Sequence, residues 1–199
     1  MAEFKHRRKA IRLRGYDYSQ PGEYFVTICT KDREHILGKI EAGRMLLNGF
    51  GEIVALCWMD LPNHYPGVQA DQFVVMPNHV HGIIVITERN LVGEGSEPSP
   101  TTRRHPLSEI VRSFKTFSAR RINECRGTPG LSVWQRNYYE HIIRDERSLE
   151  RIRVYIVSNP ERWVADENNL EQGAMDEFSS WINQEGMKSP RFSSSTSRQ

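Results

Sequence analysis

The chain has 199 residues, 38% of them hydrophobic, with a mean hydropathy of −0.61 and a formal net charge of +2. No apolar run reaches the roughly 18 residues that a membrane helix needs, and no apolar stretch follows the basic amino terminus, which argues against a secretory signal. The three cysteines share no metal-ligand spacing, which indicates reduced thiols in a cytosolic protein. The composition therefore predicts one well-buried domain with extensions.

Charge is distributed unevenly along the chain. Residues 1–14 carry six basic side chains against Glu3 alone, and residues 103–126 carry seven against two acids. Residues 161–185 carry seven acids against Arg162 alone. The basic segments indicate a polyanion as partner, although charge runs are more often only solvated faces.

The predicted elements alternate between strands and helices. In chain order they are a strand over 24–30, short strands at 36–37 and 44–47, a helix over 49–61 that ends at Pro62, strands over 73–76 and 80–87, a loop over 90–106, a helix over 107–123, a strand-like segment over 133–143 and a helix over about 145–159. This order predicts an α+β fold, a ferredoxin-like sandwich in which helices pack on one face of an antiparallel sheet.

His79 and His81 are placed at the start of the second strand of a predicted strand pair joined at Pro77-Asn78. Because successive strand residues alternate faces, both imidazoles should leave the sheet on the same side. Two neighbouring imidazoles are half of a divalent-metal site, although a lone His-x-His is by itself weak evidence.

The last predicted helix carries polar side chains that could complete a site with the two histidines. Leu149, Ile152 and Ile156 form the stripe that packs on the sheet, and Tyr155 and Asn159 lie four residues apart on one flank of it. Arg151 lies one turn earlier on that flank. The amide oxygen of Asn159 is a suitable hard ligand, whereas the structural alternative makes Tyr155 a core aromatic and Asn159 a helix cap.

Several segments, in order, carry a resemblance to a known family. They are Gly-Tyr-Asp-Tyr-Ser at 15–19, Tyr-Phe-Val-Thr-Ile-Cys-Thr at 24–30, Val-Met-Pro-Asn-His-Val-His at 75–81, Ser-Phe-Lys at 113–115, Trp-Gln-Arg-Asn-Tyr-Tyr-Glu-His-Ile-Ile-Arg at 134–144 and Tyr-Ile-Val-Ser-Asn-Pro at 155–160. With them the chain resembles the single-tyrosine HUH transposases, where U is an apolar residue, and most of all the REP-associated tyrosine transposases.

The resemblance implies a metal-dependent DNA transposase that cleaves and rejoins single-stranded DNA near a hairpin or repeat through a 5′-phosphotyrosine. His79, His81 and Asn159 would hold Mg²⁺ or Mn²⁺, and Tyr155 would be the nucleophile. Other members of the family place Gln where this chain has Asn159. The implied partner is single-stranded or hairpin DNA, bound by a monomer or a homodimer with no membrane involved.

Alternatives remain at this point. Tyr138 and Tyr139 are rival nucleophiles, although packing or base stacking suits their strand-like segment better, and Glu140 or His141 could join the metal. A domesticated repeat-binding protein without strand-transfer activity is the main alternative function, and an unrelated metal-dependent hydrolase using the two histidines is another.

DNA contacts are expected from the charge pattern. The candidate phosphate-binding and base-stacking residues are Arg7, Arg8 and Arg12 of the basic arm, Arg112, Lys115, Arg120 and Arg121 of the middle helix, Arg151, and Trp134 with Tyr138 as stacking surfaces. The predicted organisation is a basic arm (1–11), a catalytic domain (12–165), an acidic extension (166–185) and a Ser-rich tail (186–199). We expect a cytoplasmic, nucleoid-associated protein of the bacterial type.

Overall fold

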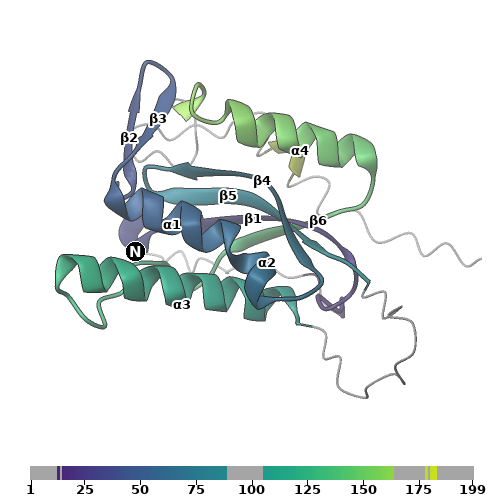
Figure 1. The fold of residues 1–199 in the computed structure, drawn as a ribbon. Coiled ribbons are helices and arrows are strands. Elements are labelled where there is room, and N and C mark those ends of the chain that lie inside the picture. The colour runs from purple at the N-terminus through teal and green to yellow at the C-terminus, as the bar shows by residue number, and fades with distance from the viewer. Residues whose placement is uncertain (1–12, 14, 89–104, 164–177, 179, 183–199) are drawn as a thin grey trace, which may run out of the picture.

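The computed structural model describes residues 13, 15–88, 105–163, 178 and 180–182. Its centre is a four-stranded antiparallel sheet in the order β4-β5-β1-β6 (Figure 1). The strands are β1 (Gly22–Cys29), β4 (Val68–Met76), β5 (His79–Ile86) and β6 (Tyr139–Ile143). A separate two-stranded sheet pairs β2 (Gly38–Glu41) with β3 (Arg44–Leu47).

The predicted α+β fold with an antiparallel sheet is confirmed. The chain runs from β1 through helix α1 (Gly49–Met59) to β4 and β5, then through helix α3 (Leu107–Arg126) to β6. With the strand order above, this is the ferredoxin-like arrangement. A short helix, α2 (Leu61–His64), follows α1 and carries Pro62 in its first turn, where proline is tolerated, so the helical segment does not end at Pro62 as predicted.

The helices cover both faces of the sheet rather than one (Figure 1). Helices α1 and α3 pack with one set of strand side chains, including Tyr24, Val26 and Ile84, in a large apolar cluster. Helix α4 (Glu146–Ser158) packs on the opposite face with Phe25 and Ile83. The prediction of a single covered face therefore holds only for the two helices that connect sheet strands.

The face toward α1 is closely packed at Gly82 of β5. A Cβ on this residue would lie 2.3 Å from the Trp58 ring of α1, and Trp58 is fully buried. Trp58 also stacks with Phe73 and meets Phe114 of α3 edge-on. Glycine at 82 thus lets an aromatic ring lie directly on the sheet backbone.

Some boundaries differ from the sequence-based expectation. The short strand predicted at 36–37 begins instead at Gly38, and of the strand-like segment 133–143 only Tyr139–Ile143 is a strand. On α3, Phe117 is 45% exposed, whereas Ser118 is fully buried and donates to the Phe114 carbonyl. The basic arm, most of the predicted 90–106 loop and the Ser-rich tail lie outside the described residues.

Candidate active site

The two histidines of β5 lie side by side on the α4 face of the sheet. His79 is fully buried and His81 is 2% exposed, and their ring centroids are 4.3 Å apart. On β1 they face Cys29 and Thr27, respectively. The alternation of the strand therefore does place both imidazoles on one side of the sheet.

Asn78, in the turn before β5, orients His79. The Asn78 side chain is fully buried, and its Nδ2 donates to the Arg33 carbonyl at 3.1 Å. Its Oδ1 is then directed at His79 Nδ1, 2.8 Å away, and because an amide oxygen only accepts, Nδ1 must carry the hydrogen. The lone pair of the neutral His79 ring is therefore on Nε2.

Thr27 of β1 plays the corresponding part for His81. Its hydroxyl lies 2.9 Å from His81 Nδ1, and His81 Nε2 lies 3.3 Å from the Tyr155 hydroxyl. When Nδ1–H donates to Thr27, Nε2 is the acceptor for the phenol. A second polar partner behind each imidazole is the arrangement found around metal-ligating histidines.

Helix α4 brings the tyrosine to the sheet. Asp145 caps its amino terminus and accepts from the Ser148 amide at 2.8 Å. Leu149, Ile152 and Ile156 are buried against the strands, as the predicted stripe requires, and Tyr155 is buried with them at 4% exposure. The Tyr155 ring meets Phe25 edge-on, with centroids 6.2 Å apart.

Asn159 follows as the residue that ends α4 and is 1% exposed. It lies between Tyr155, which contacts His81, and Trp163, whose ring stacks with His79 at 6.0 Å. Tyr155 and Asn159 are four residues apart at the end of α4, so the Asn159 side chain is expected on the flank of the helix that carries Tyr155.

The Asn159 Oδ1 atom is buried and makes no hydrogen bond to any described residue. Leaving such an atom unpaired costs about 1–3 kcal/mol, so it calls for an explanation. A hard oxygen beside two imidazoles whose Nδ1 atoms are engaged matches the donor set of a divalent cation. His79, His81 and Asn159 therefore fit the ion that the family resemblance implies.

Within the described part of the chain, no group of three His, Cys, Asp or Glu side chains could hold a metal. Glu140 cannot supplement the histidine pair, because its neighbours on β6, Tyr139 and Ile143, belong to the α4 face and Glu140 alternates with them. His141 is on the α4 face, opposite Phe25 on β1 and near Trp181. In the expected site, the third protein ligand would be the Asn159 amide.

Three residues at this site escaped the sequence-based prediction. The Arg162 guanidinium lies 5.9 Å from the centre of the Tyr155 ring, Trp163 covers His79, and Phe178 stacks on Tyr155 with centroids 3.6 Å apart. Arg151, a predicted DNA contact, is exposed and lies over the Trp181 ring at 4.3 Å. Arg162 is seven residues after Tyr155, so helical periodicity extended past Pro160 could have found it.

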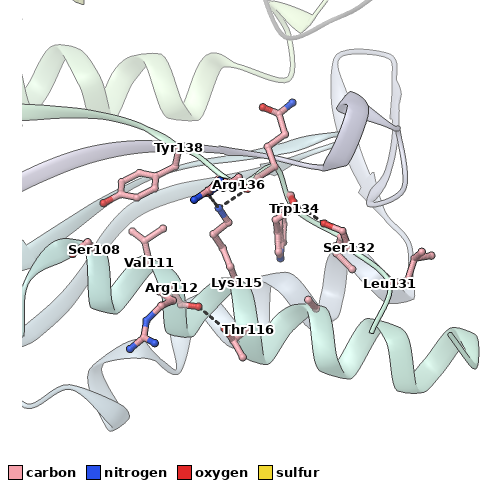
Figure 2. Close-up of a pocket in the computed structure, with 13 residues that line it drawn as sticks. Ser108, Val111, Arg112, Lys115, Thr116, Leu131, Ser132, Trp134, Arg136 and Tyr138 are labelled. Atoms are coloured by element: carbon pink, nitrogen blue, oxygen red, sulfur yellow. Dashed lines mark hydrogen bonds between the residues drawn. The ribbon is translucent and has the colours of Figure 1, made fainter. Parts of the chain in front are cut away.

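The predicted DNA-binding residues of α3 lie beyond the opposite face of the sheet. Arg120 is exposed and pairs with Glu124, Arg121 donates to Cys57, and Arg112 is exposed. Lys115 donates to the carbonyls of Gln135, Arg136 and Asn137, and burial lowers its pKa to about 8 (Figure 2). The arm residues Arg7, Arg8 and Arg12 lie outside the described residues.

Trp134 is not available as a stacking surface, which corrects that prediction. Its ring is 6% exposed, its indole N–H donates to the Ser118 hydroxyl at 3.0 Å, and it packs beside Phe114. The residue is therefore part of the core between α3 and the sheet. Tyr138 is half-buried and keeps part of its ring accessible.

The part of the chain that is described contains no helix long and apolar enough to cross a membrane.

Comparison with known protein sequences finds two relatives of this chain in Haemophilus influenzae. No protein-family model matches the sequence. An uncharacterised protein of Haemophilus influenzae is 42% identical over 172 residues, which are 81% of this chain and 93% of that protein. A second Haemophilus influenzae protein, named "Putative REP-associated tyrosine transposase", is 24% identical over 145 residues, covering 72% of this chain and 73% of its own.

Among solved structures, a REP-associated tyrosine transposase bound to a REP hairpin superposes with a TM-score of 0.51 at 20% identity, over 76% of this chain and 73% of the other. This likeness shows a common fold. The fold that the sequence resemblance implies is thereby confirmed. The chain belongs to one family with the uncharacterised Haemophilus influenzae protein and is similar in sequence and fold to REP-associated tyrosine transposases.

Proposed function

We propose that the protein is a metal-dependent single-tyrosine transposase that cleaves and rejoins single-stranded DNA near hairpin or repeat sequences. The observation that carries the proposal is the Tyr155 hydroxyl, held 3.3 Å from His81 in a buried cluster of two histidines and an amide. The relationship to REP-associated tyrosine transposases, one of which binds a REP hairpin, supports DNA of this kind as the substrate.

In the proposed reaction, the Tyr155 oxygen attacks a phosphorus of the DNA strand. A P–O bond to Tyr155 forms, the bond to the 3′ oxygen breaks, and a 5′-phosphotyrosine and a free 3′-OH result. One phosphodiester replaces another, so the step is near energy balance and can run backwards to join a strand. Arg162, beside the Tyr155 ring, places positive charge where a phenolate would form.

His79, His81 and Asn159 would hold Mg²⁺ or Mn²⁺, which supplies Lewis-acid polarisation of the scissile phosphate and stabilises the leaving oxygen. Asn78 and Thr27 would keep the two imidazoles in the tautomer that offers Nε2. The three ligands come from a strand and a helix rather than from loops, which suits a fixed coordination geometry.

A DNA-binding relative without strand-transfer activity is the second candidate. The observation that favours it is the coverage of Tyr155, which is 4% exposed and stacked under Phe178. A nucleophile must reach the DNA, so Phe178 would have to move away before the reaction proceeds. The two candidates differ in whether a covalent species forms.

The test is a cleavage assay with end-labelled, hairpin-bearing single-stranded DNA and a divalent ion, resolved on a denaturing gel. The wild type should give a slowly migrating protein–DNA species, and Tyr155→Phe should give none while still binding DNA. Tyr139→Phe, on the same face of the sheet, is the matched control and should retain the species. An adduct that persists in Tyr155→Phe would overturn the assignment, and hydrolysed products without any adduct would indicate a metal-dependent hydrolase.

A further inference from the structure

A groove of about 480 Å³ runs between α3 and residues 131–138, on the side of the sheet opposite Tyr155 (Figure 2). Val111, Arg112 and Lys115 contribute to it from the helix, and Leu131, Arg136 and Tyr138 from the facing segment. The function proposed above uses none of this surface for chemistry.

Every charged side chain that lines the groove is basic. They are Arg112, Lys115 and Arg136, with no acidic residue among the lining. The guanidinium groups of Arg112 and Arg136 are exposed and make no hydrogen bond or ion pair to another described residue. Arg120 and Arg153, by contrast, are each paired with a carboxylate. Unpaired arginines beside an acid-free groove favour an anionic ligand.

Lys115 differs from the two arginines, because its ammonium binds the backbone of the segment that forms the groove wall. Its ammonium donates to the Gln135 and Arg136 carbonyls at 2.6 and 3.1 Å, and to the Asn137 carbonyl at 3.4 Å. These bonds hold the segment that carries Arg136 against α3 (Figure 2). The wall is also partly apolar, since Leu131 is 50% exposed and Tyr138 is half-buried. A ligand with regularly spaced anionic groups and flat apolar faces, such as a nucleic acid strand, matches both features.

Backbone contacts link the groove wall to the strand that pairs with β5 at His79. Trp134 forms an isolated bridge with Thr30, and the Gln135 amide donates to the Cys29 carbonyl at 3.0 Å. Cys29 is in turn the register partner of His79 on β5. The groove wall therefore lies at the same end of the sheet as His79, one strand away from it.

We propose that this groove binds a segment of the same DNA molecule that Tyr155 cleaves, with phosphates at Arg112 and Arg136. The proposal rests on the proposed function for the identity of the ligand, and it assigns substrate recognition to a surface separate from the catalytic cluster. A DNA strand that leaves the groove past residues 134–135 would reach the end of the sheet at which His79 lies.

The first test measures binding of a fluorescent DNA hairpin with a single-stranded flank, over a range of salt concentrations. All proteins carry Tyr155→Phe, so that no cleavage is needed. Each lost phosphate contact should reduce the slope of log K against log[salt] by about 1, so Arg112→Gln/Arg136→Gln should reduce it by about 2. Arg44→Gln/Arg147→Gln, which removes the same charge from exposed positions outside the groove, should leave the slope within about 0.5 of the parent. Equal slopes for the two double variants would overturn the proposal.

The second test locates the DNA directly. A photo-crosslinking amino acid replaces Leu131, in the groove wall, or Leu56, which is 56% exposed on α1 outside it. We expect crosslinks to the hairpin DNA from position 131 and none from position 56. Equal crosslinking at both positions, or none at 131, would overturn the proposal that the groove binds DNA. Because neither test requires cleavage, a failure here leaves the Tyr155 adduct assay unaffected, and a failure of that assay leaves these results standing.

Discussion

On β5, Val80, Ile84 and Ile86 face α1 and α3, whereas His79 and His81 face α4. Both sets are buried to a similar degree, yet the first belongs to a large apolar cluster and the second to a polar group with Thr27 and Tyr155. Burial of polar groups costs free energy unless each finds a partner. The difference teaches that the α1–α3 face maintains the fold, while the α4 face accepts a cost in stability to hold reactive groups.

The largest effect is expected on activity at the α4 face. His81→Ala removes a proposed metal ligand and the partner of Tyr155, so the DNA adduct should fall by more than the 10–100-fold that loss of a supporting residue costs. Because the ring is buried, the truncation should also lower the unfolding free energy, so the adduct is compared in protein that is still folded. Gel quantification of the adduct, with urea unfolding alongside, checks both, and near-wild-type adduct formation would contradict the role of His81.

The matching change on the other face is Ile84→Ala. Ile84 is fully buried in the apolar cluster, so its truncation should lower the unfolding free energy by about 2–5 kcal/mol while the remaining folded protein still binds a divalent ion. Urea unfolding and calorimetric titration with Mn²⁺ are the measurements. If Ile84→Ala abolished ion binding in protein that is still folded, the division between the two faces would be wrong.

Asn78→Ala tests the support behind the histidines. It removes the acceptor for His79 Nδ1–H, so affinity for Mn²⁺ should drop about 10–100-fold. Nitrogen-15 shifts of the imidazoles, recorded without metal, should show His79 losing its single tautomer. Asn63→Ala, on the exposed helix α2, is the control and should alter neither quantity. Unchanged shifts in Asn78→Ala would remove Asn78 from the account.

Asn159→Leu separates stability from function at one residue. Its Oδ1 is buried without a hydrogen-bond partner among the described residues, so an apolar replacement should raise the unfolding free energy by up to about 1–3 kcal/mol and weaken Mn²⁺ binding. Thermal unfolding without metal, together with titration calorimetry, reads both effects. A destabilised variant with normal ion affinity would favour a capping role for Asn159.

The smallest expected effect is a pH dependence of stability that comes from Lys115 of α3. Burial lowers the pKa of this lysine to about 8, so between pH 8 and its ordinary value the folded protein binds fewer protons than the unfolded chain. Its contribution to stability therefore rises with pH across that window. The stability difference between wild type and Lys115→Met, followed by urea unfolding, should shift in favour of the wild type as the pH rises above 8 and stay constant below it; a shift in the opposite direction would contradict this.

Local periodicity was sufficient to predict the central features of the candidate site. The two-residue period placed His79 and His81 on one face, and the helical period placed Tyr155 and Asn159 on one flank. Contacts between residues distant in the sequence were not predictable in this way. Thr27 lies 54 residues before His81 and meets it only through the register of β1 with β5.

The placement of α4 shows the same limit. Its apolar stripe was recognisable, but the choice of sheet face depends on which face α1 and α3 already occupy. Phe178 lies within the predicted acidic extension, and its charged sequence neighbours gave no indication that it is buried. In the structure, Phe178 and Ile182 pack against α4. The predicted boundary at residue 165 stays a prediction.

The central claim is that Tyr155 forms the covalent bond to DNA, and peptide mapping of the trapped adduct tests it most directly. After nuclease and trypsin digestion, mass spectrometry should find the residual nucleotide on the peptide that contains Tyr155. A nucleotide on the peptide containing Tyr138 and Tyr139, or on no tyrosine at all, would contradict the account.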